Sequence, residues 1–477
     1  MSLHEKHLKA LEQKDFLQSR VETDIEKIKK DTSGACWHID EVSLYMRESA
    51  KNLDTLSYDE KSKMPFYGLT VGMKDLFCIS GLTTTAGSKI LNSFKAPYDS
   101  TVWQTLSQKG ALLGAKLAMD EFAMGSFSNT SYLGKVSLPG FPDRTAGGSS
   151  GGSGAALKAG LVDFATGSDT GGSVRLPAAF CSQVGYKPSY GAFSRYGMIA
   201  YASSLDQAGL LTHTLKDMKY LMDSDIAVKD IKDMTSRKLH SVFSEKRRKL
   251  KIGYFPEFLE NDVIESEIKI AYQDLISKLK TTHELMPVSI PFMDKAAQIY
   301  YILACSEASS NLARYQGVFF GEKLVNEKFE GNYWEQCAQY RSKFFGIEVQ
   351  KRIMLGSFIL SAENFSSMYQ KAVKLRQSLK DEFAKQFTSI DTLLLPTSPI
   401  LAPKWDEISK MTSAQIYMSD FMTVPFSLAG LPALSVPWYE SKDGLGIGMQ
   451  FVGSYMQDHQ LIEDVLKIEL EIKKEVS

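Results

Sequence analysis

Two clusters of glycine and serine in the first half of the chain constrain its fold most. Residues 144–154 read RTAGGSSGGSG, and residues 165–180 read ATGSDTGGSVRLPAAF. Glycine tolerates positive φ and close backbone approach, so such clusters form nests of N–H groups that can hold a phosphate or an oxyanion. A flexible linker has a similar composition. The apolar, helix-like ALKAGLVDFA between the clusters leaves no room for a domain boundary, which favours two loops of one folded core.

The pattern around these loops predicts an α/β protein. In residues 66–212, short apolar runs bounded by glycine, such as GLTVGM and GALLGAKLAM, predict buried strands alternating with helices. Near the end of the chain, DTLLLPTSP, LPALSVPWY and LGIGMQFVG are strand-like, and HQLIEDVLKIELEIKK is typical of an amphipathic helix. We therefore expect a single large domain over residues 61–477, with a mixed central β-sheet flanked by helices.

Two charged regions predict additional helices. Residues 1–60 carry apolar residues at helical spacing, including Leu8, Leu11, Phe16 and Val21, and predict a helical region that packs on the core. Residues 213–385, roughly, contain charged stretches such as KDMKYLMDS and FSEKRRKL. We interpret that range as helical insertions.

The bulk composition excludes several classes of protein. The net charge of −1, with 44% hydrophobic and 23% charged residues, is typical of a soluble globular chain and provides no overall field for nucleic acid or membrane. Five scattered cysteines without a C-x-x-C pair argue against a disulfide framework or a structural zinc site. The N-terminus lacks a signal-peptide core, and no run of 18 apolar residues is present. These features predict a cytoplasmic (bacterial) or organellar-matrix protein that does not bind a membrane.

The glycine-rich motif permits three rival interpretations. A P-loop requires Gly-Lys, which neither cluster has, and a dinucleotide fingerprint requires a preceding strand. The segment Gly147–Gly151 matches the G-x-S-x-G of α/β-hydrolases, with His459 late enough to be the base. That elbow also requires a preceding strand, and LPGFPDRTA is a poor one. Nucleotide binding and the α/β-hydrolase are both disfavoured.

A serine nucleophile without histidine needs another base, and Lys74 offers one. It follows the apolar run in FYGLTVGMKDLFCISG, and lysine is rarely buried without a reason. Burial would lower its pKa so that the amine is neutral near pH 7. If this segment is considered alone, a surface lysine at the end of a strand would have the same sequence pattern.

These segments together resemble the amidase signature family. The family has a lysine as in GMKD, a serine as in GGSSGG and a serine as in GSDTGGSVR, and the match continues through CSQVGYKPSYGAFSRYGMIAYASSLDQAG, residues 181–209. The resemblance implies a triad in which Ser173 is the nucleophile, Ser149 is a bridging serine after a cis peptide bond, and Lys74 is the general base. It also implies an oxyanion hole around Thr170, Gly171 and Gly172.

Within the family, the chain most resembles the glutaminase component of the tRNA-dependent amidotransferase, the A-type polypeptide, whose substrate is glutamine. The segments that carry this resemblance are residues 98–126, 306–317, 348–362 and 419–437. It implies that Arg352 binds the glutamine carboxylate, that Asp420 binds its ammonium group, and that Tyr301, or its neighbour Tyr300, lines the pocket. Arg352 on the face of a charged helix, and Asp420 as a helix N-cap, are the alternatives.

The resemblance also implies partners. Ammonia would pass to a B-type subunit that uses ATP and Mg²⁺ to activate misacylated Glu-tRNA(Gln) or Asp-tRNA(Asn), and a small third subunit would complete the enzyme. No cofactor is expected in this chain. A stand-alone amidase for a small or hydrophobic carboxamide is the alternative, and an inactive scaffold is disfavoured because all three triad residues are present. The chain departs from the family pattern in VSLPGFPDRTAGGSSGG, at Gln316 and in GACWHID.

Overall fold

The computed structural model describes residues 1–239, 249–318, 320 and 328–476. Its centre is one mixed sheet of 11 strands, which confirms the predicted α/β fold. In sheet order the strands are β1 (Cys36–Trp37), β3 (Leu112–Leu117), β2 (Thr70–Lys74), β6 (Phe164–Asp169), β8 (Gln207–Thr212), β7 (Val184–Lys187), β12 (Ala433–Glu440), β13 (Gly446–Val452), β11 (Thr392–Pro396), β9 (Lys251–Tyr254) and β10 (Glu284–Pro287). Strand β2 is parallel to both β3 and β6, whereas β6 is antiparallel to β8.

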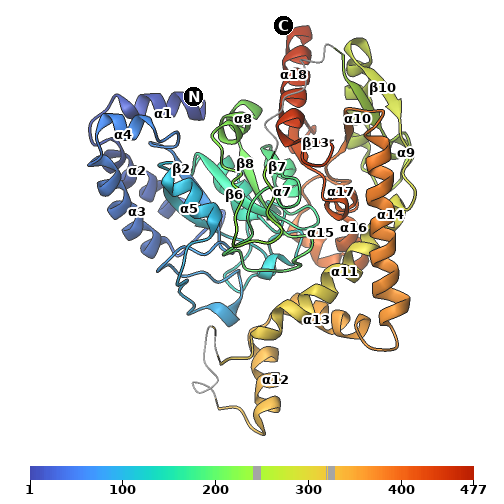
Figure 1. Ribbon diagram of the computed structural model, residues 1–477, viewed down its shortest axis with the longest axis horizontal. Helices are drawn as coiled ribbons and strands as arrows, with labels where there is room; N and C mark the ends of the chain where they lie inside the picture. The colour runs from blue at the N-terminus through green and yellow to red at the C-terminus, as the bar shows by residue number, and fades with distance from the viewer. Residues whose placement is uncertain (240–248, 319, 321–327, 477) are drawn as a thin grey trace.

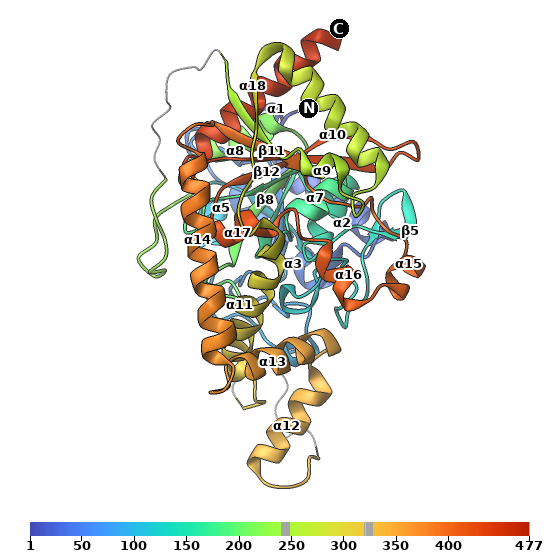
Figure 2. The same cartoon turned by 90° about the vertical axis from the view of Figure 1, so that its right-hand side faces the viewer.

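Helices cover the sheet and both ends of the molecule (Figure 1). Those before β9 are α1 (Leu3–Leu11), α2 (Phe16–Lys30), α3 (Ile39–Asp54), α4 (Tyr58–Ser62), α5 (Thr101–Gln108), α6 (Gly151–Lys158), α7 (Arg175–Phe180) and α8 (Leu215–Asp223). Those after it are α9 (Glu257–Glu260), α10 (Ser266–Thr282), α11 (Ala296–Asn311), α12 (Tyr333–Phe344), α13 (Ile347–Ile359), α14 (Lys371–Gln386), α15 (Trp405–Lys410), α16 (Ser413–Met418), α17 (Val424–Ala429) and α18 (Asp458–Val476). Helix α12 projects from the body in both views (Figures 1 and 2).

The N-terminal helices gather at the end of the molecule drawn in blue in Figure 1. Helix α2 buries Leu17, Val21, Ile25 and Ile28, whose spacing of three and four residues places them on one face. Helix α1 differs from the predicted pattern. Leu8 is 47% exposed, because the buried face of α1 consists of Leu3, His7 and Ala10.

The range 213–385 contains strands as well as helices. Strands β9 and β10 pair in parallel, and β9 also pairs with β11, so this segment extends one edge of the large sheet. The sequence predicted only helices here, because each strand has four residues in a charged context and little alternation. Most of the predicted helical stretch FSEKRRKL, residues 243–248, lies outside the described residues.

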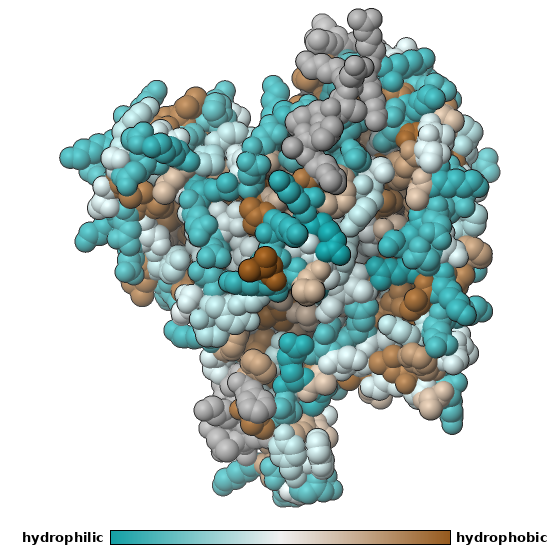
Figure 3. Space-filling model, viewed as in Figure 1, coloured by the Kyte–Doolittle hydropathy of each residue, from teal (hydrophilic) through white to brown (hydrophobic). Residues whose placement is uncertain are grey.

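Hydrophilic residues predominate on the face in Figure 3, with hydrophobic ones scattered between them. In the part of the chain that the structure describes, no helix is long and apolar enough to cross a membrane. All five cysteines are free thiols.

Candidate active site

Lys74 ends strand β2 in the interior of the sheet and is fully buried. Its Nζ lies 2.8 Å from each of three hydroxyl oxygens, those of Ser149, Ser150 and Ser168. Burial lowers the pKa of Lys74 to about 7, although nearby Asp120, Asp169 and Asp206 act to raise it. Lys74 is therefore no surface lysine, and its pKa lies well below that of an exposed lysine.

Ser149 lies in the turn before helix α6, and the Gly148–Ser149 peptide bond is cis. Its carbonyl accepts a hydrogen bond of 3.1 Å from the backbone N–H of Asp120. The buried carboxylate of Asp120 in turn accepts from the N–H groups of Ser128 and Asn129, each at 2.9 Å. Ser149 is thus held on both sides, by Lys74 at its hydroxyl and by the segment after β3 at its backbone.

A strand does precede this turn, contrary to what its sequence predicted. It is β5 (Phe141–Thr145), which pairs with β4 (Ser137–Leu138) in a separate two-stranded sheet and forms one isolated bridge, between Arg144 and Lys404, but among the described residues does not pair with the main sheet. The nucleophile elbow of an α/β-hydrolase would extend a strand of the main sheet. His459 lies in the first turn of α18, which packs on α8, α10 and β13. The hydroxyl of Ser149 is bound by a lysine instead.

Ser173 lies in the loop between β6 and α7, residues 170–174. Its carbonyl accepts from the N–H of Ser150 at 3.1 Å, which joins this loop to the turn that carries Ser149. Among the hydrogen bonds between described residues, none is donated by the backbone nitrogens of residues 170–173. These four consecutive N–H groups therefore have no hydrogen-bond acceptor among the described residues.

The glycines of this loop are required by close packing. A Cβ at Gly172 would lie 2.3 Å from Thr423 Oγ1, and one at Gly171 would lie 3.0 Å from the Tyr300 hydroxyl. Neither distance leaves room for an ordinary side chain without displacement of its neighbour. The resemblance implied Thr170, Gly171 and Gly172 for the oxyanion hole, and the structure places all three directly before Ser173.

Arg352 lies on α13 with only 3% of its surface exposed, so it does not belong to a solvated helix face. Its Nε donates to Glu348 at 2.8 Å, and its Nη1 donates to the Tyr201 hydroxyl at 2.7 Å. Within the described residues Nη2 donates no hydrogen bond. Three aromatic rings surround the guanidinium group. Its Cζ lies 5.4 Å from the ring centroids of Tyr201 and Tyr301 and 5.8 Å from that of Tyr417. Arg352 therefore offers a partly unsatisfied guanidinium in an aromatic enclosure.

Asp420 is also buried, and it is not the helix cap that the sequence allowed. The N-cap of α17 is Thr423. The Asp420 carboxylate accepts from the Ser126 hydroxyl at 3.0 Å. Burial raises its pKa to about 7, against the lowering effects of that hydrogen bond and of Arg352. Asp420 is therefore a buried carboxyl group whose ionised form is disfavoured by its surroundings.

The two neighbouring tyrosines of α11 serve different sides of the site. Tyr301 stacks on Tyr417 with ring centroids 4.1 Å apart and lies over Arg352. Tyr300 lies against the loop of Ser173. A Cβ added at Gly171 would lie 3.0 Å from the Tyr300 hydroxyl oxygen. Both candidates therefore lie at the site, with Tyr301 near the guanidinium.

Several residues of the site had not been identified from the sequence. Ser150 and Ser168 contact Lys74, and Tyr201 and Tyr417 enclose Arg352. Only the Glu348–Arg352 pair had a visible signal, since a spacing of four brings two residues together on a helix. The described residues contain no group of three His, Cys, Asp or Glu side chains that could hold a metal ion.

The site thus combines a buried lysine bound to three serine hydroxyls with a glycine-containing loop whose backbone N–H groups have no acceptor among the described residues. The family model described as Amidase matches residues 21–462, and the chain belongs to this family of enzymes. It is 42% identical, over 87% of its length and 86% of the relative's, to the A-type polypeptide of glutamyl-tRNA(Gln) amidotransferase from Prochlorococcus marinus (strain MIT 9211). The corresponding polypeptide from Orientia tsutsugamushi (strain Ikeda) is 39% identical, over 89% of this chain and 88% of that one.

Solved structures agree with this assignment. The A-type polypeptide of glutamyl-tRNA(Gln) amidotransferase from Thermotoga maritima superposes with a TM-score of 0.71 at 35% identity, covering 89% of this chain and 90% of that one. A crystal structure described as an amidase has a TM-score of 0.79 at 29% identity and covers 99% of this chain and 100% of its own.

Proposed function

We propose that this chain is the glutamine-hydrolysing subunit of a tRNA-dependent amidotransferase, with Lys74, Ser149 and Ser173 as its catalytic triad. The observation that carries the proposal is the fully buried Lys74, whose Nζ is 2.8 Å from Ser149 Oγ. The likeness to A-type amidotransferase polypeptides along most of both chains supports the choice of glutamine.

The chemistry follows from the positions of the groups. Neutral Lys74 takes a proton from Ser149, which takes one from Ser173, and Ser173 Oγ attacks the carboxamide carbon. The N–H groups of residues 170–173 stabilise the oxyanion, and removal of one such donor typically costs about 3–4 kcal/mol. The proton returns through Ser149 to the leaving nitrogen as the C–N bond breaks. Ammonia departs, and water hydrolyses the acyl-enzyme to release glutamate.

Recognition of glutamine requires an anionic and a cationic group beside the triad. Arg352 Nη2 is directed to the α-carboxylate, because Nε and Nη1 are already bound by Glu348 and Tyr201. Asp420 pairs with the α-ammonium, which would stabilise its ionised form. The stacked Tyr301 and Tyr417 form the wall beside the guanidinium. A neutral amide would use none of the charged groups.

The released ammonia requires an acceptor. We propose that a B-type subunit, with the help of a small third subunit, activates the misacylated Glu-tRNA(Gln) or Asp-tRNA(Asn) with ATP and Mg²⁺ and receives it. Misacylated tRNA would bind mainly through that partner, since the net charge of this chain is −1. The enzyme would act in the bacterial cytoplasm or an organellar matrix.

The test is ammonia release from glutamine and from a panel of simple amides, with the chain alone and with partner subunits, ATP and misacylated tRNA. We expect a preference for glutamine that increases when the partners are present. Ser173→Ala, Ser149→Ala and Lys74→Ala should each abolish hydrolysis without loss of the fold. Full activity of any one of these three variants would refute the triad.

A stand-alone amidase acting on a small or hydrophobic carboxamide is the second candidate. It is favoured by the likeness to a solved amidase over the whole of both chains. Vigorous hydrolysis of neutral amides without partners, together with poor hydrolysis of glutamine, would establish this alternative. The triad would be the same in both cases, so the Arg352 and Asp420 variants distinguish them.

A further inference from the structure

The pairing of two strands brings Asp206 next to the loop that carries Ser173. Strands β6 and β8 are antiparallel, and their last paired residues at this edge are Asp169 and Gln207. The chain therefore continues beyond this pair as Thr170 on one side and Asp206 on the other. Thr170 begins the loop of Ser173, and Asp206 ends the loop of residues 201–206.

The two carboxylate oxygens of Asp206 are divided between these loops. Oδ1 accepts from the Thr170 hydroxyl at 2.8 Å. Oδ2 accepts from the N–H of Tyr201 at 2.8 Å and from that of Ala202 at 2.9 Å. Asp206 is only 2% exposed, so these bonds are protected from water. One buried group thus joins the loop of the nucleophile to the loop of Tyr201.

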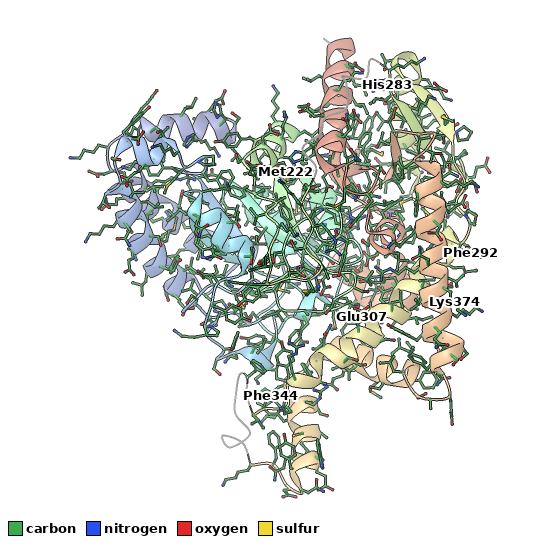
Figure 4. All side chains as sticks on the ribbon, viewed as in Figure 1. Met222, His283, Phe292, Glu307, Phe344 and Lys374 are labelled. Atoms are coloured by element: carbon green, nitrogen blue, oxygen red, sulfur yellow. The ribbon has the colours of Figure 1, made fainter. Side chains whose placement is uncertain are left out.

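The loop of Tyr201 is also held from the side of the helices. The N–H of Ser204 donates at 2.8 Å to Glu307 on α11, which is labelled in Figure 4. Arg376 on α14 donates to the Ser204 carbonyl at 2.8 Å. The Tyr201 hydroxyl accepts from Arg352 at 2.7 Å. This loop is therefore held by α11 and α14, and through Tyr201 it contacts Arg352 on α13. Asp206 joins the same loop to Thr170.

We propose that Asp206 is a positioning residue that sets the spacing between the N–H nest at residues 170–173 and the Tyr201–Arg352 pair. A substrate with a carboxamide at one end and a carboxylate at the other must reach both places at once. A displacement of about 1 Å between them is enough to lower the rate by roughly a hundredfold. The half of this inference that concerns Arg352 rests on the proposed function, and the half that concerns Thr170 does not.

The test uses two substrates, glutamine and butanamide, because butanamide lacks the charged end. The variants of the full-length chain are Asp206→Ala, the conservative Asp206→Asn, Thr170→Val, and the double variant Asp206→Ala with Thr170→Val. Asp233→Ala is the matched control. Asp233 is also a buried loop carboxylate, and it accepts from the N–H groups of Arg195 and Thr235, at 2.8 and 2.9 Å, which lie outside the site. Melting temperatures monitor the fold of every variant.

We expect Asp206→Ala to lower kcat/KM roughly tenfold for butanamide and roughly a hundredfold for glutamine. Asp206→Asn should recover most of the loss, because an amide can still accept from the two N–H groups and can donate to the Thr170 hydroxyl. Thr170→Val should slow both substrates by a similar factor. The double variant should be no slower on butanamide than Asp206→Ala, since both changes remove the same hydrogen bond.

Equal losses on both substrates in Asp206→Ala would overturn the spacing role, as would losses no larger than those of Asp233→Ala. Additive effects in the double variant would overturn the link through Thr170. Failure of the proposed function has a different signature. In that case wild-type chain would hydrolyse glutamine no better than butanamide, Arg352→Ala would change neither, and the butanamide series would still decide the link to Thr170.

Discussion

Asp169 and Arg175 close the loop that carries Ser173 with a buried, bidentate ion pair. Arg175 Nη2 lies 2.8 Å from Asp169 Oδ1, and Arg175 Nε lies 2.9 Å from Oδ2. Both side chains are fully buried, and Arg175 also donates to the Gly171 carbonyl at 3.1 Å. The two ends of the loop are thus joined by buried, charge-assisted hydrogen bonds, which restrict its conformation.

This clamp predicts a large effect on stability. Arg175→Met keeps much of the volume but leaves the Asp169 carboxylate buried without its partner. We expect the free energy of unfolding to fall by about 3–5 kcal/mol, measured by urea unfolding and tryptophan fluorescence. The double variant with Asp169→Asn should lose less than the sum of the two single changes, because no unpaired charge remains. A loss below about 1 kcal/mol in Arg175→Met would contradict this account.

Two buried lysines with similar pKa values should behave in opposite ways. Lys187, like Lys74, is fully buried with its pKa lowered to about 7, yet its Nζ donates to backbone carbonyls, including that of Pro188 at 3.0 Å. We expect Lys74→Met to lower kcat by about 10²–10⁴-fold and to keep the fold. Lys187→Met should lower the melting temperature, because it leaves buried carbonyls unsatisfied, and the folded protein should keep its kcat. Ammonia assays and thermal melts of both variants check this pair.

The pH dependence should differ between a charged and a neutral substrate. The proposed base Lys74 can accept a proton only when it is deprotonated, and its pKa is about 7, so kcat/KM for any amide should rise through pH 7 and level off above it. Glutamine also needs ionised Asp420, whose pKa is also about 7, so its kcat/KM should fall more steeply below pH 7 than that of butanamide. Profiles from about pH 5.5 to 9 measure both slopes. Asp420→Asn should make the two slopes equal, and parallel profiles in the wild-type chain would refute the role of Asp420.

Arg352→Lys tests the planar guanidinium in the recognition of glutamine. Lysine keeps the charge but loses the fork of donors, so kcat/KM for glutamine should fall roughly ten- to hundredfold, mainly through KM. Butanamide should be hydrolysed at the wild-type rate. Arg341→Lys on the neighbouring helix is the control, since Arg341 donates to the carbonyls of Leu312 and Tyr315, at 2.8 and 3.2 Å. If the two variants gave the same KM for glutamine, Arg352 would not bind the substrate.

Much of the fold could be predicted because its strands are apolar runs bounded by glycine. Strands β2, β3, β12 and β13 lie where such runs occur, and β11 lies in the apolar run of DTLLLPTSP. The short strands β9 and β10 could not be found this way, because partners from distant parts of the chain determine that they are strands. For the same reason the pairing of β5 with β4 rather than with the large sheet had no signal in its sequence.

The candidate site divides in a similar way. Lys74 was proposed from its apolar segment, and Ser149 and Ser173 were proposed through the resemblance of their glycine-rich motifs to the amidase signature family. Tyr201 and Tyr417 had no such signal, because a tyrosine acquires a role only when folding places it over Arg352. Asp206 lies in the segment SSLDQAG, and no feature of that segment marked it as a residue of the site.

The sequence by itself determined the chemical groups of this protein and the loops that carry them. Glycines at residues 171 and 172 allow the close packing of the N–H nest, and a lysine at the end of an apolar strand supplies the candidate base. Only the tertiary structure decided the environment of these groups. The lowered pKa of Lys74 and the contact between Thr170 and Asp206 arise from burial and strand register. Both depend on segments far apart in the chain, so no local pattern encodes them.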